Sequence, residues 1–539
     1  MRKKDKFTRF LEIIPGFLSW SILLTPFILS FKAPKAVALF IICFDFYWLC
    51  KAIVMGAYLI SGYIHIRRET NLDWVDKLEK LKNIKEYKEE LKKEIRKKKG
   101  FGYILERKKL KEELKQLEKI AEKKLNWEEI YHVILLPTYK ESLDILEASV
   151  QACLDSEYPI SLDKRFIFVL AIEEREGNSA LEKAKYLRNK YGKRFFKFLI
   201  TIHPDGIEGE LKAKGANVNW AGRKLKLLID FLKIPYEKVL VSCFDADTRP
   251  HRKYFTCLTY KYLINPSRIK RSYQPIPLYA NNIWEVPPLN RVVAFGSTFW
   301  QMIESVRPKR LINFSSQAMS LKTLVDIDFW DKSIVSEDSR QYYRAFFRYK
   351  GDHKVIPIFC PVYMDAVLGR NLWETLKNQY KQKRRWAWGV EHFPYLIKES
   401  ISHKEIPILP KLILIFRLLN GHLSWATASL LIAFVGWMPF IFSPSFRSTV
   451  LAYNMPLMAR DLLTLTWIGI FISSTISILL LPPKPLKYSK IKYAEMILQW
   501  VLVPLTAIFF GSIPAIDAQT RFALGKELGF WVTPKYRRN

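Results

Sequence analysis

The chain has 539 residues, 49% of them apolar and 26% charged, and its formal net charge is +34. Long apolar blocks lie towards both ends, with a mixed stretch between them, which excludes a uniformly soluble composition and leaves room for more than one domain. This segregation predicts an integral membrane protein with a soluble catalytic or binding domain between its spans.

Much of the positive charge lies in one lysine-rich insert and in loops beside the apolar blocks. This distribution favours membrane lipids over nucleic acid as the anionic partner, so no nucleic-acid binding is predicted. The six cysteines form no Cys-x-x-Cys pair and histidine is scarce. The sequence therefore predicts neither a zinc site nor a disulfide framework, in keeping with a reducing, cytosolic environment.

Region 1–70 contains two apolar blocks, 13–31 and 37–64, each long enough to cross a bilayer. No small-residue cleavage site follows the first block, which is therefore expected to be a retained span, not a signal peptide. Asp45 and Lys51 in the second block either pair or face protein, or else reach the interface. Basic flanks place the N-terminus and the middle domain in the cytoplasm, at the plasma (inner) membrane.

Region 71–127 is dense in lysine, glutamate and leucine, with apolar residues at three- and four-residue spacing. Gly100 and Gly102 break it near its middle, which predicts an antiparallel helical hairpin. The hairpin is expected to be either a structural arm or a docking surface for a partner or lipid headgroups.

Region 128–380 alternates strand-like and helix-like segments, with strands expected at 130–137, 165–172, 195–202 and 238–244. This alternation predicts an α/β domain with a mostly parallel sheet and helices on both faces. Ligands bind such sheets beyond the carboxyl ends of the strands, where Thr138, Glu173 and Asp245 lie.

The last of these strands leads into Asp245-Ala-Asp247. Residues i and i+2 of a strand point the same way, and just past the last ladder bond, at the end of the strand, both carboxylates can face one cation. Mg²⁺ or Mn²⁺ prefers oxygen ligands and keeps phosphates as co-ligands, which predicts a metal holding a diphosphate. The alternative is an ordinary acidic loop.

Three short polar constellations follow. Asn313 to Gln317 is a polar patch, and Ser336-Glu-Asp338 precedes a helix, where Ser336 or Asp338 could be an N-cap. In region 381–405, Gln382, Arg385 and Trp386 share one helical face that suits phosphate oxygens and a sugar ring. The same segment also fits an interfacial helix anchored by tryptophan.

Region 406–515 is expected to contain membrane helices, with spans at 423–442 and 462–481. The apolar run at 494–515 contains Pro504 and has basic residues on both sides, which favours a broken, re-entrant segment. Region 516–539 is expected to be an interfacial segment with a terminal tail.

The motifs Asp245-Ala-Asp247, Ser336-Glu-Asp338 and Gln382-Lys-Arg-Arg-Trp386, bracketed by spans, together resemble the membrane-integrated family 2 glycosyltransferases, which include cellulose and hyaluronan synthases. Pro137 to Glu141 is similar to the family's first nucleotide-binding loop, and Lys214 to Asn219 to its Lys-Ala-Gly-Asn-Leu-Asn segment. Phe314-Ser-Ser-Gln317 resembles an acceptor patch. Phe530 to Lys535 resembles a gating loop, or is a membrane-surface anchor. The chain departs from the family in three places. Glu173-Glu174 stands where an Asp pair is usual, the gating-loop motif lies at the very end of the given sequence, and the helical arm has no counterpart in the family.

The resemblance implies a GT-A-like fold and inverting transfer of a sugar from a nucleotide-diphosphate donor, with Mg²⁺ or Mn²⁺ as cofactor. It implies Asp338 as general base and Asp245 and Asp247 as metal ligands. The donor would contact Thr138, Tyr139, Glu141, Glu173, Lys214, Asp245, Gln382, Arg385, Thr533 and Lys535, and the acceptor would contact Phe314, Ser316, Glu337 and Trp386. Lys214 could instead be a solvated loop lysine.

Three functions remain open at this point. The first is a polysaccharide synthase that extends a chain and exports it, and the second is an enzyme that glycosylates a lipid acceptor at the inner leaflet. The third is a non-catalytic scaffold that binds anionic lipid through its basic arm.

Overall fold

The computed structural model describes residues 5–98, 100, 103–120, 126–529, 531, 533–534 and 536–537. The chain divides into two compact units. The helical unit comprises Met1–Ile64, Tyr279–Val306 and Asp365–Asn539, and the sheet unit comprises His65–Leu278 and Arg307–Met364.

The sheet unit is built on an eight-stranded sheet of the described residues, in the order β3-β2-β1-β4-β7-β6-β8-β5. Neighbouring strands are parallel from β3 through β4, β7 runs antiparallel to both β4 and β6, and β8 is parallel to β6 but antiparallel to β5. The strands are β1 (Tyr131–Pro137), β2 (Phe166–Glu173), β3 (Lys197–His203), β4 (Val239–Cys243), β5 (Arg249–Pro250), β6 (Arg271–Leu278), β7 (Ala318–Ser320) and β8 (Lys354–Tyr363). The predicted mostly parallel sheet is confirmed, but its antiparallel half was not foreseen.

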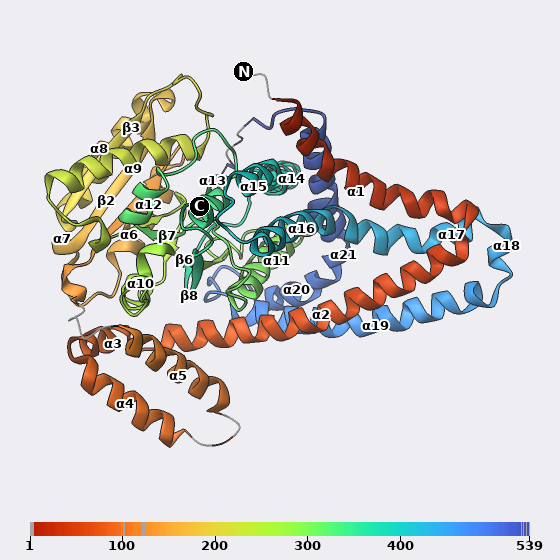
Figure 1. Cartoon of the computed structure of the whole chain (residues 1–539), viewed down its shortest axis with the longest axis horizontal. Helices are drawn as coiled ribbons and strands as arrows, with labels where there is room; N and C mark the ends of the chain where they lie inside the picture. Colours follow the sequence, from red (N-terminus) through yellow and green to blue (C-terminus); the bar gives the residue numbers. More distant parts are fainter. Residues whose placement is uncertain are drawn as a thin grey trace. The chain divides into compact units, whose positions relative to one another are not determined.

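Helices cover both faces of this sheet, as predicted (Figure 1). Alternate residues of the buried strands point to opposite faces, so Ile134 and Phe168 join one core whereas Val133 and Val169 join the other. The first core includes α6 (Leu143–Leu154), α8 (Asn178–Tyr191) and α10 (Tyr254–Leu263), and the second includes α9 (Lys214–Phe231) and α12 (Leu321–Asp326). The shorter α7 (Leu162–Arg165) precedes β2, and α13 (Glu337–Arg348) precedes β8.

The lysine-rich arm forms the predicted hairpin from α4 (Ile84–Lys97) and α5 (Ile104–Lys119), preceded by a short helix, α3 (Trp74–Lys80). The arm packs on α10. Trp74 lies 5.5 Å from Tyr260 between ring centroids, and the hydroxyls of Tyr87 and Tyr260 are 2.9 Å apart. Lys77 and Glu113 form an ion pair at 2.6 Å beside them. The arm is therefore part of the core of this unit, which supports a structural role.

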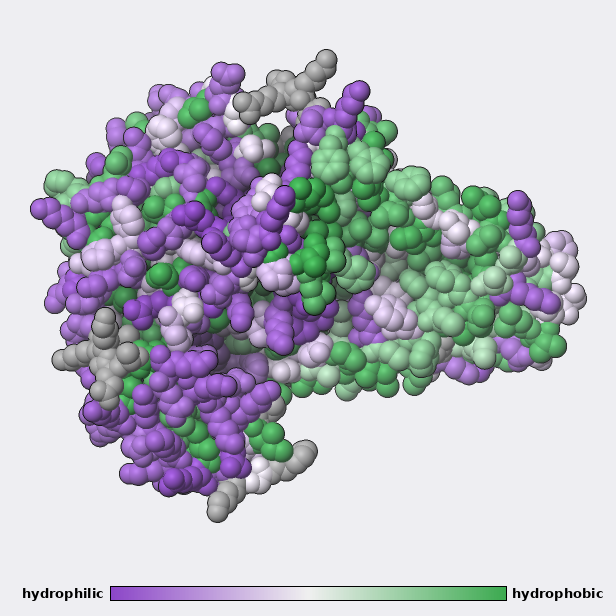
Figure 2. Space-filling view, in the orientation of Figure 1, coloured by the Kyte–Doolittle hydropathy of each residue, from purple (hydrophilic) through white to green (hydrophobic). Residues whose placement is uncertain are grey.

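Four helices of the described residues are long and apolar enough to cross a membrane: Lys6–Lys32, Pro34–Asn71, Ile408–Phe442 and Ile491–Ala523. The first two are α1 and α2. The third run comprises α16 (Ile408–Phe434), a 3₁₀ segment (Val435–Trp437) and α17 (Met438–Phe442). Figure 2 shows hydrophobic residues gathered over α1, α2 and α19, as expected of helices that face lipid.

Two predictions concern the later membrane helices. The span expected at 462–481 overlaps α19 (Val450–Leu479), in which the described stretch Thr464–Leu479 is apolar. The run expected to be re-entrant is broken as predicted, into α20 (Ile491–Leu498), α21 (Val503–Ala507) and α22 (Ile513–Ala523), by one 3₁₀ and one π segment. Its 33 residues are nevertheless long enough to cross, so its length does not confine it to a shallow insertion.

The helical unit also contains α11 (Pro288–Ser305), which lies between β6 and β7 in the sequence. α14 (Leu372–Ala387) and α15 (His392–Ser402) lie between β8 and α16, and α18 (Pro444–Arg447) lies between α17 and α19. α14 carries the segment Gln382 to Trp386 and packs against α22, with the Arg384 guanidinium 2.9 Å from the Asp517 carboxylate.

The core around α9 makes a paired test possible, because Leu225 is fully buried whereas Leu227 on the same helix is 60% exposed. We expect Leu225→Ala to lower the free energy of unfolding by about 2–5 kcal/mol, since it removes apolar contacts and leaves a cavity. Leu227→Ala should change it by less than about 0.5 kcal/mol. Denaturant unfolding of the purified protein in detergent measures both, and equal effects would contradict the described packing.

Candidate active site

The two aspartates after β4 are positioned by a turn. β4 ends at Cys243, close to the predicted strand end at 244, and both aspartates follow it as predicted. The Thr248 amide donates to the Asp245 carbonyl at 2.9 Å, and the Asp245 amide donates to the Thr248 hydroxyl at 3.1 Å. Within this turn the Asp247 side chain is buried, at 1% exposure, whereas that of Asp245 is 26% exposed. The two carboxylates therefore differ in their access to solvent.

Lys214 gathers three carboxylates from two segments that are far apart in the sequence. Its ammonium nitrogen lies 2.7 Å from an Asp245 oxygen, 3.2 Å from Asp338 and 3.5 Å from Glu337. Lys214 opens α9 and only 14% of its side chain is exposed. The interpretation of Lys214 as a solvated loop lysine is therefore wrong. We call Asp245, Glu337 and Asp338 the carboxylate cluster.

The residues after Lys214 allow α9 to begin this close to the cluster. A Cβ atom on Gly215 would lie 2.4 Å from the Asp331 carbonyl oxygen, so only glycine fits there. The Asn217 side-chain amide donates to the carbonyl oxygen of Ala171 on β2 at 3.0 Å, and that of Asn219 donates to the Trp330 carbonyl at 2.5 Å. These contacts hold the first turns of α9 between the sheet and the segment that leads to α13.

The polar patch at 313–317 supports the site from behind. The Gln317 side-chain amide donates to an Asp338 carboxylate oxygen at 3.3 Å. Ser316 is fully buried in the left-handed region at φ +63°, and its hydroxyl lies 3.1 Å from that of Thr248. Ser316 thus contacts the turn that carries Asp245 and Asp247. Its expected contact with the acceptor stays a prediction. Phe314 is half-buried and its amide donates to Gln274 at 2.8 Å.

Burial and charge act in opposite directions in this cluster. Burial raises the pKa of Asp338 above its ordinary value of 3.8, opposed by the Lys214 charge and reinforced by that of Asp245. Burial alone would lower the pKa of Lys214, but the charges of Asp245 and Asp338 outweigh it and hold that pKa well above 10.5. One ammonium thus faces three carboxylates, and the excess negative charge suits a divalent cation.

The first turn of α13 contains the acidic motif for which a helix N-cap was the alternative interpretation. Ser336 occupies the N-cap position of α13, and Glu337 and Asp338 lie in its first turn. Acidic residues there are stabilised by the amino end of the helix. Glu337 and Asp338 nevertheless also lie within reach of Lys214, so a position in the first turn and membership of the cluster are compatible.

The loop after β1 forms a second group of contacts. The hydroxyl of Thr138 and the amide of Tyr139 donate to the Glu141 carboxylate at 2.8 Å and 2.6 Å. Glu173, at the end of β2, is ion-paired with Arg175, whose guanidinium lies 4.1 Å from the centre of the Tyr139 ring. Arg175 was not singled out from the sequence, where no motif marks it.

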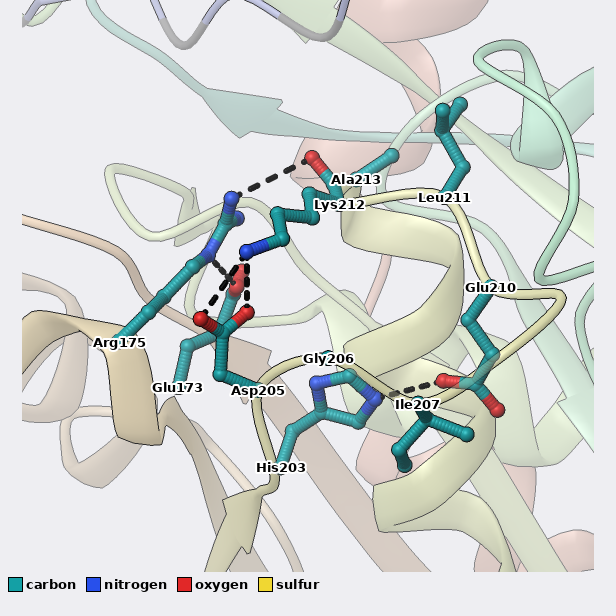
Figure 3. A pocket seen from close by; sticks show the side chains of 10 residues that line it. All are labelled: Glu173, Arg175, His203, Asp205, Gly206, Ile207, Glu210, Leu211, Lys212 and Ala213. Carbon is teal, nitrogen blue, oxygen red and sulfur yellow. Dashed lines mark hydrogen bonds and ion pairs between the residues drawn. The ribbon is translucent and has the colours of Figure 1, made fainter.

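Beside Glu173 and Arg175 lies a small pocket of about 30 Å³ (Figure 3). Figure 3 shows Arg175 reaching from Glu173 towards the Lys212 carbonyl, and an ion pair of Lys212 with Asp205 across the same opening. The ion pairs of Arg175 with Glu173 and of Lys212 with Asp205 therefore line this small opening.

The remaining candidates belong to the helical unit. Gln382, Arg385 and Trp386 lie on α14 as predicted, and the Trp386 ring lies 6.2 Å from that of Tyr279. The Lys383 ammonium lies 4.5 Å from the centre of the Trp386 ring. The carboxylate cluster belongs to the sheet unit, so convergence of Arg385 and Trp386 with it stays a prediction.

The C-terminal tail contacts the helical unit at several described residues. The Lys381 ammonium lies 4.9 Å from the centre of the Trp531 ring, and Arg537 is ion-paired with Asp365 at 3.0 Å. Thr533 is buried at 8% exposure. Lys535 lies outside the described residues, so its predicted contact with the donor stays a prediction.

No family model and no curated protein matches the chain. Among solved structures, a mannosyltransferase from Pyrobaculum calidifontis, in complex with GDP-Man and Mn²⁺, shares 15% identity at a TM-score of 0.39 over 65% of this chain and 87% of that one. TarS residues 1–349 from S. aureus shares 11% at 0.32, over 70% and 91%. GalNAc-T7 with UDP, GalNAc and Mn²⁺ shares 9% at 0.27, over 57% and 58%. Such distant likeness leaves function to be inferred from the chain's own side chains.

Removing the Lys214 charge should destabilise the sheet unit. We expect Lys214→Met to lower the free energy of unfolding near neutral pH by at most about 3–5 kcal/mol, because three carboxylates lose their partly buried cation. The loss should shrink as the pH falls towards 5, since the raised pKa of Asp338 lets it take up a proton earlier than a free aspartate.

The matched control is Lys212→Met, which removes an exposed lysine two residues away. Thermal unfolding midpoints of both variants across this pH range measure the effect. Equal, pH-independent shifts in the two variants would contradict the central position of Lys214.

Proposed function

We propose that the chain is a membrane-bound inverting glycosyltransferase that moves a sugar from a nucleotide-diphosphate donor to a growing polysaccharide, in a manner coupled to export. The observation that carries this proposal is the junction of Asp245, Glu337 and Asp338 around Lys214, beyond the carboxyl ends of the parallel strands. It joins two of the motifs on which the resemblance to family 2 glycosyltransferases depends.

The residues present fit a divalent cation. The donor set after β4 consists of carboxylate oxygens, which Mg²⁺ and Mn²⁺ prefer, and the cluster has more negative charge than Lys214 balances. Asp245 and Asp247 would hold the ion, whose Lewis acidity would supply neutralisation of the diphosphate. Bound phosphate oxygens would complete its ligands.

Asp338 is proposed as the general base that accepts the proton of the acceptor hydroxyl. Its raised pKa makes it a better proton acceptor than an ordinary aspartate, and Lys214 and Gln317 fix the direction of its carboxylate. A single in-line displacement at the anomeric carbon needs one base and inverts the configuration. No covalent intermediate is required.

The other roles follow from the chemistry of each side chain. Glu173 with Tyr139 and Arg175 would receive the nucleobase after the ion pairs of the small pocket open, while Thr138 and Glu141 shape the same loop. In the helical unit, Gln382 and Arg385 would contact the donor phosphates and Trp386 the acceptor sugar. Phe314 and Glu337 would border the acceptor, and Thr533 and Lys535 would close over the bound donor.

The membrane placement is part of the proposal. The four candidate spans and the basic N-terminal segment support a plasma-membrane protein with its sheet unit in the cytoplasm, where nucleotide sugars are made.

The first experiment screens nucleotide sugars for turnover by the purified, detergent-solubilised chain with Mg²⁺ or Mn²⁺. We expect one donor to be consumed, turnover to stop with a chelator, and re-addition of Mg²⁺ or Mn²⁺, but not Zn²⁺ alone, to restore it. If no nucleotide sugar is consumed with any of the metals, the enzymatic proposal is refuted in favour of the lipid-binding scaffold.

The size of the product separates two acceptor classes. Incubation with labelled donor should give a ladder of polymer lengths. A single lipid-soluble adduct would instead support the alternative, a non-processive enzyme that glycosylates a lipid at the inner leaflet. The carboxylate cluster and Lys214 would have the same roles with a polysaccharide acceptor and with a lipid acceptor.

The base is tested by Asp338→Asn, which keeps the shape of the side chain but removes its proton affinity. We expect transfer to fall about 10²–10⁴-fold, the usual contribution of a general base, while donor affinity changes little. Radiolabelled transfer and donor binding by calorimetry measure the two quantities.

The control for this experiment is Asp163→Asn, an exposed carboxylate on α7 outside the cluster. It should leave both transfer and binding unchanged. Normal transfer by Asp338→Asn would remove Asp338 from the role of base.

A further inference from the structure

A second group of metal-ligating side chains lies inside the sheet unit, away from the carboxylate cluster. The carboxylate of Glu69, the thiol of Cys257 and the thiol of Cys360 have ligand atoms that all lie within 4.8 Å of one another, and all three residues are buried. They come from the end of α2, from α10 and from β8, so the fold assembles them from three distant segments.

The thiols already point at Glu69. Cys257 Sγ lies 3.7 Å from a Glu69 carboxylate oxygen, and Cys360 Sγ lies 3.6 Å from the Glu69 carbonyl oxygen. Ligands of a tetrahedral zinc ion, bound at about 2.0–2.3 Å, are separated by roughly 3.3–3.8 Å. The distance from Cys257 Sγ to the Glu69 carboxylate falls in this range, and the ligand atoms of all three residues lie within 4.8 Å of one another, so the group is compact enough for one ion.

The surroundings orient the carboxylate and balance its charge. Lys261 is ion-paired with both Glu69 oxygens at 2.7 Å and 2.8 Å and also donates to the Pro357 carbonyl at 2.8 Å, while the Phe359 amide donates to Glu69 at 3.0 Å. Two thiolates, one carboxylate, one lysine and a divalent ion sum to zero charge. A neutral assembly is the arrangement that a buried site tolerates best.

We propose that Glu69, Cys257 and Cys360 form a structural zinc site that fastens the end of α2 to α10 and β8. Thiolate sulfur selects zinc over Mg²⁺ or Mn²⁺, which distinguishes this site from the carboxylate cluster. On binding, the two thiols release their protons to solvent and zinc forms two Zn–S bonds and one Zn–O bond. A water molecule would take the fourth position, as at zinc sites that have three protein ligands.

A site of this kind escapes sequence analysis. Cysteines at 257 and 360 lack the short Cys-x-x-Cys spacing by which zinc sites are recognised, and the carboxylate comes from a membrane helix.

The test measures zinc in the full-length protein, purified in detergent under reducing conditions without added metal or chelator. Inductively coupled plasma mass spectrometry should find about one zinc ion per chain, the stoichiometry of one such site. The double variant Cys257→Ser/Cys360→Ser should contain only background zinc. Cys153→Ser, which removes another buried thiol of the same unit from α6, should retain the wild-type content.

A second measurement does not depend on the folding of the variant. Zinc added to metal-stripped wild-type protein should raise its thermal unfolding midpoint, because a ligand that binds the folded state stabilises it. Mg²⁺ at the same concentration should not. Absence of zinc with no zinc-dependent shift, zinc retained by the double variant, or a Cys257–Cys360 disulfide in the reduced preparation would each overturn the proposal. Loss of sugar transfer alone has no bearing on it.

Discussion

The candidate active site depends on one buried cation. Lys214 lies between carboxylates from the end of β4 and the start of α13, residues that repel one another and would not share a space without it. Its position is set in turn by Gly215, since any larger residue would push α9 away from the Asp331 carbonyl. A single ammonium thus couples the packing of a helix to the geometry of the cluster.

The sheet explains why these groups meet. Parallel strands β1, β2 and β4 end at the same edge, which brings the loop after Pro137, Glu173 and the Asp245 turn to one side. β7 then enters antiparallel to β4, so the patch that precedes it, with Ser316 and Gln317, lies against the same turn. The change of direction between these two strands is what allows a later segment of the chain to brace an earlier one.

Much of this architecture could be predicted from the sequence, because buried parallel strands are continuous apolar runs that periodicity detects. β1 to β4 and the helical hairpin were found in this way. The antiparallel half was missed because β7 spans only three residues and β6 contains two prolines, which weaken the strand signal.

The residues of the site were named from motifs, but their partners were not predictable. The strand end before Asp245 was predicted, but the turn closed by Thr248, which leaves Asp245 part-exposed and buries Asp247, was not. Arg175 and the salt bridge it forms with Glu173 depend on a local turn that no pattern marks. Contacts between segments more than 100 residues apart, such as Lys214 with Asp338, follow only from the folded chain.

Two of the buried lysine–carboxylate pairs in the sheet unit, Lys214–Asp245 and Lys261–Glu69, have different neighbours, and the neighbours decide what each pair can do. Lys214 is surrounded by further carboxylates, so the local charge is negative and hard cations with phosphate are the matching ligands. Lys261 compensates one carboxylate that has two thiols beside it, so the local charge is near zero until those thiols ionise, and only a soft cation makes that favourable. The proposed zinc site and the proposed Mg²⁺ or Mn²⁺ site thus differ in the softness of their ligands, so the two would not compete for one ion.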